Sequence, residues 1–364
     1  MKIVCDSAKL AKACMNVQRT VSNKSTIPAI EGILIDALGD NVRLTGYDLE
    51  VGSETYIPSE IEENGSVILN ARNLCDILRM VPDETVSIES DERNICKIKS
   101  GETEYSIIGT SSDEYPDLPT ISGGFPIVIN QGLLKDMIRK TIFSVSTSER
   151  NPVHSGIKFE ISEGKIVLVA VDGARLAIRR EDIDYSGESV SFVVPAKTLG
   201  EIVKLSEDDE DVYSISVGKR HISFEVGEYR IISRLLEGNF IDYKAAIPLS
   251  ASTNVIAPTK RVIECVERTA LIITDRSSPV RCVIENAMLK FSSVTSIGTA
   301  SDKMPADITG GDIEIGFNSK FILDALKACE TDEIKIELNS ANQPILILPT
   351  QGDKFLFLVL PVRI

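Results

Sequence analysis

Short apolar runs and helical apolar spacings alternate along the chain. Runs such as Val67–Leu69 are typical of buried strands, whereas Leu74, Ile77 and Leu78, three and four residues apart, predict one face of an amphipathic helix. The same helical spacing recurs at five other places. It predicts six helices in all, at residues 7–20, 71–81, 132–144, 196–206, 259–271 and 318–329.

The strand that runs into a helix is part of an internal repeat. The segment Val67–Leu78 recurs as Phe192–Val203, 125 residues later, and as Ile315–Leu326, a further 123 residues along. The same order of elements surrounds each copy: an opening strand, a helix, several short strands, the second helix and more strands. Three copies of this unit account for the 364 residues of the chain.

The repeat predicts an α+β fold of three similar domains, each with two helices packed on antiparallel sheets. Helices of about 12 residues are too few to cover both faces of long parallel sheets, which disfavours an α/β fold. We expect the domains to span residues 1–123, 124–250 and 251–364. Pro, Gly and Ser gather at residues 115–124 and 247–253, as is typical of linkers.

The charge of the chain is unevenly distributed. Its 39 Lys and Arg against 54 Asp and Glu give a net charge of −15, which argues against a uniformly basic nucleic-acid binder. The six predicted helices nevertheless hold 15 basic and 6 acidic residues, a net charge of +9, so the remaining residues carry −24. An acidic exterior and basic helices therefore coexist in one chain.

The second helix of each repeat carries the same pattern of charge. Arg72, Asp76 and Arg79 recur, at the offsets of the repeat, as Lys197, Glu201 and Lys204 and as Lys320, Asp324 and Lys327. Cations seven positions apart lie on nearly the same side of a helix. Each helix alone fits an ordinary solvated face with ion pairs. If the repeats surround an axis, the six helices together fit a phosphate polyanion, bound without reading its sequence.

The composition offers little material for catalysis. The seven cysteines are scattered without zinc-ligand spacing, and there are only two histidines and no phosphate-binding glycine loop. We therefore expect no metal, no cofactor, no enzyme activity and no membrane role, and a cytoplasmic location with reduced cysteines. A hydrolase that uses Asp172 or Asp48 is the weakest alternative, because no motif positions a second carboxylate.

The whole chain resembles the bacterial sliding clamps, the beta subunits of DNA polymerase III. The resemblance rests on the three repeats together with Val171–Ala177, the Asp113–Pro119 end of the first repeat, Ile315–Asn318 and the terminus Leu358–Ile364. It implies a head-to-tail homodimer that closes a six-domain ring around duplex DNA, with the helices lining the hole. The ring would slide and tether the replicative polymerase without catalysing any reaction, and a separate clamp loader would open it.

The resemblance also implies three sets of functional residues. The cations that would face DNA are Lys9, Lys12, Lys24, Arg72, Arg79, Lys135, Arg139, Lys197, Lys204, Lys260, Arg261, Lys320 and Lys327. The residues that would form a cleft for partner peptides are Val171, Gly173, Ala174, Arg175, Leu176, Ile241, Ala246, Asn318, Phe321, Leu358, Val359, Leu360, Pro361, Val362, Arg363 and Ile364. The residues that would form the dimer interface are Ile77, Val81, Tyr105, Ile107, Leu271 and Ile272.

Several alternatives remain open at this point. Ile241 and Ala174 depart from the family pattern of the cleft, and the alternation of Leu356, Leu358 and Leu360 equally predicts a buried final strand. The acidic run 207–211 lacks the ligand pattern of a calcium loop and fits a solvated turn. A competing function is a repeat scaffold that does not bind DNA and whose basic helices contact acidic protein partners.

Overall fold

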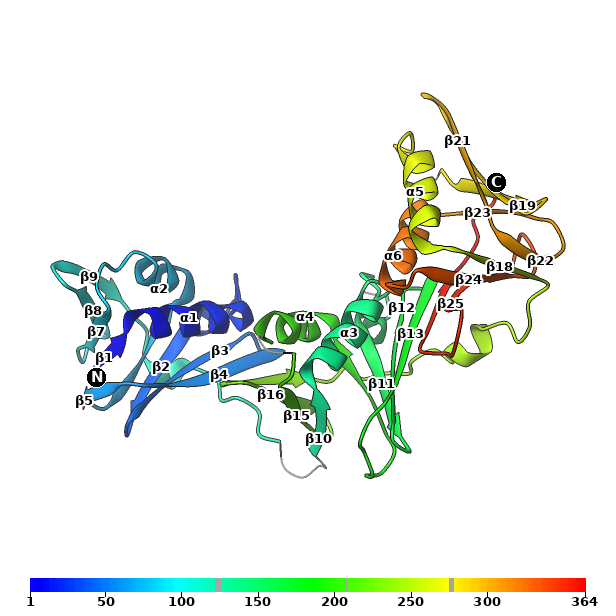
Figure 1. Cartoon of the computed structure of the whole chain (residues 1–364). Helices are drawn as coiled ribbons and strands as arrows, with labels where there is room; N and C mark the ends of the chain where they lie inside the picture. The colour runs from blue at the N-terminus through cyan, green and yellow to red at the C-terminus, as the bar shows by residue number, and fades with distance from the viewer. Residues whose placement is uncertain (122–125, 149, 207–208, 275–277) are drawn as a thin grey trace. The chain divides into compact units, whose positions relative to one another are not determined.

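The computed structural model of the protein describes residues 1–121, 126–148, 150–206, 209–274 and 278–364. These residues form two compact units (Figure 1). The first unit contains Met1–Gly132 and Lys197–Leu235, and the second contains Leu133–Ala196 and Leu236–Ile364. The predicted boundary between residues 123 and 124 lies outside the described residues, as do residues 207–208 of the acidic run. The predicted domain limits therefore stay a prediction.

Six α-helices lie within three residues of their predicted bounds. They are α1 (Ser7–Val17), α2 (Ala71–Leu78), α3 (Gln131–Ile142), α4 (Ala196–Leu205), α5 (Thr259–Ala270) and α6 (Ser319–Cys329). Side-chain caps explain where three of them begin. Asp6 accepts a hydrogen bond from the backbone N–H of Lys9 at 2.8 Å, and Asn70 and Asn318 cap α2 and α6 in the same way.

The predicted order of elements recurs three times among the described residues. An opening strand is followed by a helix, three strands, a strand that leads into the second helix, and three more strands. The first repeat contains β1 (Lys2–Asp6), β2 (Gly32–Leu38), β3 (Asn41–Tyr47), β4 (Val51–Pro58), β6 (Gly65–Asn70), β7 (Thr85–Ser90), β8 (Ile95–Ser100) and β9 (Thr103–Ile108). The second contains β10 (Pro126–Asn130), β11 (Gly156–Ser162), β12 (Lys165–Val171), β13 (Arg175–Asp182), β14 (Val190–Pro195), β15 (Val212–Val217), β16 (His221–Val226) and β17 (Tyr229–Arg234).

The third repeat follows the same order. It contains β18 (Thr253–Pro258), β19 (Val280–Glu285), β20 (Met288–Thr295), β21 (Gly298–Pro305), β23 (Ile313–Phe317), β24 (Glu333–Leu338), β25 (Ile345–Pro349) and β26 (Phe355–Val359). The first and third repeats each add a short strand that pairs with their opening strand, namely β5 (Glu60–Glu63) and β22 (Asp307–Gly310). The α+β fold of three clamp-like repeats is confirmed.

Two antiparallel sheets form each unit. In the first unit the strand orders are β5-β1-β7-β8-β9 and β10-β15-β16-β17-β4-β3-β2-β6. In the second unit they are β14-β11-β12-β13-β26-β25-β24-β18-β22 and β21-β20-β19-β23. Helices α1 and α2 lie side by side on the sheets of the first repeat, and α5 and α6 do so in the third (Figure 1).

Strand pairing continues the sheets from one repeat into the next. In the first unit β4 pairs antiparallel with β17, with Gly52 opposite Ile232. In the second unit β13 pairs antiparallel with β26, with Leu176 opposite Leu358. The register is the same at both junctions. The corresponding strands β9 and β21 are the end strands of their sheets, so each leaves one edge unpaired within the described chain.

The cores lie between the paired helices and the sheets. In the first repeat, Leu10, Cys14 and Val17 of α1 and Leu74 of α2 are fully buried against the strands. The end of α1 lies so close to β3 that a Cβ atom on Gly46 would stand 2.6 Å from the carbonyl oxygen of Val17. Glycine at that position therefore lets the helix pack directly on the sheet.

Candidate functional site

The cations predicted to face DNA are exposed, with one exception. Twelve of the thirteen side chains are exposed on the helices or, for Lys24, on the loop after α1. The exception is Lys135, which is only 9% exposed. It follows Gln131 by four positions and precedes Ile138 by three, and both of these residues face the core of α3. The prediction that Lys135 faces DNA is therefore wrong, because its side chain is turned into the core of α3.

Each second helix neutralises one of its own cations. Arg79 contacts Asp76 at 3.0 Å in α2, Lys204 contacts Glu201 at 2.8 Å in α4, and Lys320 contacts Asp324 at 3.2 Å in α6. Such exposed pairs contribute about 0–1 kcal/mol each. A phosphate group can therefore replace the carboxylate at little cost.

Eight of the other nine exposed cations fall into two groups, and Lys12 belongs to neither. Lys197 pairs with Asp48, Lys327 pairs with Glu267 at 2.7 Å, and Arg261 pairs with Glu264 at 3.3 Å. Of the cations predicted to face DNA, the structure gives no ion pair among the described residues to Lys9, Lys24, Arg72, Arg139 and Lys260. Basic side chains without a carboxylate partner occur in all three repeats, as a surface that contacts a polyanion requires.

The predicted cleft residues meet in the second unit, partly as buried sheet. Val171 pairs with Leu176, Leu176 with Leu358, and Leu358 with Leu346, so one apolar row crosses β12, β13, β26 and β25. All four side chains are at least 93% buried, and Val359 is 1% exposed. The interpretation of the C-terminal run as a buried final strand is therefore confirmed for residues 355–359.

A hairpin turn lies at the end of this row. Asp172 Oδ1 accepts from the backbone N–H groups of Ala174 and Arg175 at 3.0 and 3.1 Å, and Gly173 adopts a φ of +91° that favours glycine. Arg175 is 8% exposed, and its Nε donates to Asp172 Oδ2 at 2.7 Å. Its guanidinium lies 4.5 Å from the centre of the Phe321 ring. The turn is therefore held rigidly beside α6.

A pocket of about 660 Å³ opens beside this turn. Ala174, Arg175, Asn318 and Phe321 line it, together with Lys320. The chain end runs past the same hairpin, since the backbone N–H of Leu360 donates to the carbonyl oxygen of Ala174 at 2.8 Å. The backbone N–H of Val362 then donates to the carbonyl oxygen of Gly316 at 2.9 Å. Leu360, Arg363 and Ile364 are exposed, and Pro361 and Val362 are half-buried.

The segment after β17 contributes different residues from those predicted. Ile241 and Ala246 are exposed, whereas Tyr243 is buried among Val171, Leu176 and Leu358, and Phe240 and Ile247 pack against the same cluster. These three side chains are absent from the predicted set because an irregular segment offers no periodicity that indicates which side faces inward. The prediction also missed Leu346, although the alternation of Leu346 and Leu348 is a usable signal.

Two polar groups border this cluster. The ring of His154 packs edge-on against Phe240 with centroids 5.3 Å apart, its Nε2 is buried without a partner among the described residues, and burial lowers the pKa of this histidine. Tyr243 donates from its hydroxyl to Glu160 at 2.8 Å. Burial and this bond raise the pKa of Tyr243.

The predicted interface residues lie on different parts of the surface. Ile77, Val81, Tyr105 and Ile107 are half-buried against the core of the first repeat. Leu271 follows α5 and is 80% exposed, and Ile272 is half-buried. The assignment of these residues to a dimer interface therefore stays a prediction.

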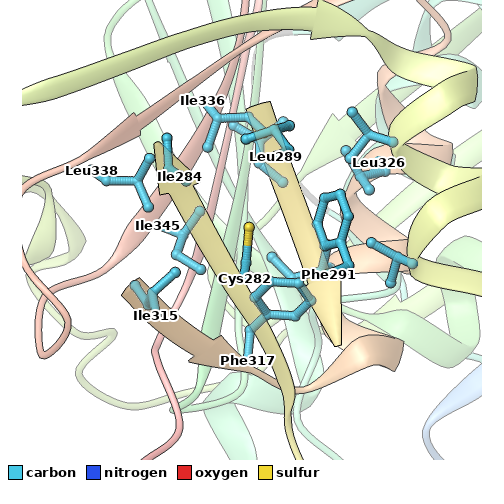
Figure 2. Close-up of a pocket in the computed structure, with 14 residues that line it drawn as sticks. Cys282, Ile284, Leu289, Phe291, Ile315, Phe317, Leu326, Ile336, Leu338 and Ile345 are labelled. Carbon is cyan, nitrogen blue, oxygen red and sulfur yellow. The ribbon is translucent and has the colours of Figure 1, made fainter. Parts of the chain in front are cut away.

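The third repeat encloses a small cavity without chemical groups (Figure 2). Its volume is about 30 Å³, and strands β19 and β20 supply Cys282, Ile284, Leu289 and Phe291 to its lining. All fourteen lining side chains are apolar, so the cavity stays dry. Burial raises the pKa of all seven cysteine thiols, to about 12 at Cys282. The described residues contain no cluster that could hold a metal ion.

No helix within the described ranges has the length and apolar character that crossing a membrane requires.

Comparisons with known proteins match the whole chain. Models of the N-terminal, central and C-terminal domains of the DNA polymerase III beta subunit match residues 1–119, 128–242 and 244–363. The beta sliding clamp of Bacillus subtilis is 34% identical, with both chains fully covered. A crystal structure of the Bacillus subtilis DNA polymerase sliding clamp superposes with a TM-score of 0.97 at 33% identity, covering 100% of this chain and 99% of that one. A putative DNA polymerase III beta subunit from Eubacterium rectale gives the same TM-score and identity, with both chains fully covered.

Proposed function

The chain belongs to the DNA polymerase III beta subunit family, the bacterial sliding clamps, and from this premise we propose that it is a processivity factor of the bacterial cytoplasm. Two copies form a ring around duplex DNA, slide along it and keep the polymerase close to the primer end. A tethered polymerase rebinds at a high effective concentration, so the clamp increases processivity without catalysing a reaction.

One observation carries the proposal that DNA contacts the helices. Six cations recur at the same positions of the second helices in three repeats of a chain whose net charge is −15, and all six are exposed. Side chains of this kind bind phosphates regardless of base sequence. The acidic remainder of the chain repels DNA elsewhere, which favours one side of the ring.

The unpaired strand edges support closure of the ring. The β4–β17 and β13–β26 pairs join successive repeats with a shared register, and β9 and β21 are the strands left over for a third junction. At that register Ser106 of one copy faces Thr299 of the other. Ile108 and Ile297, which are 84% and 65% exposed in the single chain, then come opposite each other. A head-to-tail dimer with two such junctions is closed.

The partner cleft is proposed between the Asp172–Arg175 turn and the chain end. Leu360 and Ile364 are 40% and 64% exposed, and they lie beyond a buried apolar row. An apolar peptide side chain placed there gains burial that neither surface has alone. Partner proteins of this family member, including the polymerase and the clamp loader, would share this cleft.

Charge reversal on the helices tests the DNA surface. We expect Arg72→Glu, Lys197→Glu and Lys320→Glu together to weaken DNA association. The slope of the logarithm of the association constant against the logarithm of salt concentration should become shallower by about 2–3. The matched control reverses Lys2, Lys290 and Lys335, which lie on strands. An equal loss in the control, or a loss that does not vary with salt, would contradict the proposed surface and favour a protein scaffold.

A further inference from the structure

A polar pocket of about 840 Å³ lies in the first unit. It forms where the sheet of the first repeat, strand β17 and the segment 115–120 meet. Its lining includes Asp36, Arg43, Glu54, Tyr56 and Arg230. None of these side chains belongs to the basic helices, the proposed cleft or the proposed ring junction.

The pocket occupies the position, at the first junction, that the apolar row occupies at the second. The shared register of β4–β17 and β13–β26 establishes this correspondence. Apolar residues of the second junction are replaced by polar and charged ones at the first. Arg43, Thr45, Glu54 and Arg230 of the first junction correspond to Val167, Val169, Ile178 and Leu356 of the second, in that order.

The two guanidinium groups of the pocket are more exposed than the carboxylates that pair with them. Arg43 pairs with Asp36 at 2.6 Å, and Arg230 pairs with Glu54 at 3.1 Å. The arginine side chains are 37% and 39% exposed, whereas their carboxylate partners are only 13% and 11% exposed. At these two pairs a ligand therefore meets N–H donors, with the paired acids lying beneath them, while Asp117 of the segment 115–120 adds one exposed carboxylate to the lining.

The walls of the pocket are formed before any ligand arrives. The Tyr115 hydroxyl donates to the carbonyl oxygen of Thr45 at 3.2 Å. Leu118 packs so tightly on β4 that a Cβ atom on Gly52 would lie 2.4 Å from its Cδ2. These contacts fix the segment 115–120 on the sheet, which lowers the ordering cost of binding.

The arginines retain donor capacity that the chain does not use. Arg43 contacts Asp36 through Nη2, and Arg230 contacts Glu54 through Nη1. A guanidinium has five N–H donors in a planar fork that matches a carboxylate. Tyr56 is 53% exposed and adds an aromatic surface beside them. We propose that this pocket binds a peptide segment of a partner protein through an Asp or Glu side chain.

Labelled peptides test this proposal on the intact dimer. The probe is a fluorescein-labelled (Ser-Glu)6 peptide, compared by fluorescence anisotropy with (Ser-Gln)6 and (Ser-Lys)6 at low salt. We expect (Ser-Glu)6 alone to bind. Replacing both ion pairs together leaves the net charge unchanged and should weaken binding about tenfold or more. The variant carries Asp36→Asn, Arg43→Gln, Glu54→Gln and Arg230→Gln.

Two controls locate the binding. Arg281→Gln with Glu314→Gln neutralises an exposed ion pair of 2.6 Å in the third repeat and should leave peptide affinity unchanged. Arg72→Gln removes a cation of the basic helices and should also leave peptide affinity unchanged, unless the peptide binds to those helices. Tighter binding of (Ser-Lys)6, no binding of (Ser-Glu)6, or an equal loss in either control would overturn the proposal. The pocket variant should stay on circular DNA as long as the unmodified clamp does. Failure of the peptide-binding proposal is therefore separable from failure of the proposed function.

Discussion

Arg175 donates from Nη1 to Oδ2 of Asp324 at 2.7 Å, which ties the hairpin turn of the second repeat to helix α6 of the third. Asp324 is the central acid of the charge pattern that all three second helices share. In α6 it serves two cations, because Lys320 contacts it as well. The same carboxylate therefore belongs to both the basic helix and the proposed cleft.

We expect this pair to contribute more to stability than an exposed ion pair. Arg175 is 8% exposed, so solvent screens its bond to Asp324 weakly. A double-mutant cycle with Arg175→Ala and Asp324→Ala should give a coupling free energy of about 1.5–3 kcal/mol in urea unfolding. The same cycle on Arg281 and Glu314 should give about 0–1 kcal/mol. Equal couplings would show that the buried pair has no special structural role.

Disulfide trapping tests the proposed ring junction. Ser106→Cys with Thr299→Cys places thiols on residues that the repeat register sets directly opposite, at a Cα separation of about 5 Å. Oxidation should convert the protein to a covalent dimer. All seven native cysteines are buried and should not interfere.

A shifted pair is the control for this register. Ser106→Cys with Ser301→Cys displaces one thiol by two residues along β21, to a diagonal Cα separation of about 7–8 Å, which a disulfide does not span without backbone movement. If the shifted pair cross-links as fast as the direct pair, the register taken from the internal junctions does not apply between chains.

The chain end should be required for peptide binding but not for dimer formation. Deleting residues 360–364 removes the exposed apolar side chains of the proposed cleft and leaves β9 and β21 intact. A labelled peptide with the clamp-binding segment of the polymerase should lose measurable affinity, while sedimentation still reports a dimer.

A milder variant separates the cleft from general hydrophobicity. Leu360→Ser should weaken binding of the same peptide about tenfold or more, because the complex loses an apolar contact that the peptide would bury. Ile256→Ser alters a side chain of matched exposure, 38% against 40%, and should have no effect. Unchanged affinity of the Leu360 variant would refute the cleft assignment.

Stability should depend on pH through His154. Burial lowers its pKa below the ordinary value of 6.5, so the unfolded chain binds the proton more readily than the folded one. The stabilising effect is fully present above pH 6.5 and is lost as the pH falls through 6.5 toward the lowered pKa of the folded state. His154→Phe should therefore lose less unfolding free energy than the unmodified protein between pH 7.5 and pH 5. Parallel pH profiles would contradict this role for the histidine.

The sequence predicts the helices well because their apolar spacing and polar caps act locally. Helix α6 begins one residue inside its predicted range, where the side chain of Asn318 caps it. The predicted order of strands is also confirmed, since the same pattern occurs once in each of the three repeats.

The failures have physical reasons of another kind. Whether Lys135 is exposed depends on how far the apolar face of α3 extends, and three cations on one helix do not show which of them turns inward. The floor of the proposed cleft depends on Phe240 and Tyr243, which lie in an irregular segment and acquire neighbours only when distant strands pair. The polar pocket depends on that pairing as well. It joins Arg43 and Glu54 of the first repeat to Arg230 of the second, a contact that no local pattern indicates.

Retention on DNA of different topology tests the central claim most directly. The clamp is loaded onto nicked circular DNA, excess protein is removed, and half of the sample is cut once to linearise the circle. We expect the clamp to stay on the circle for many minutes and to leave the linear molecule by sliding off its ends. Equal retention on the circular and the linear DNA would contradict topological binding.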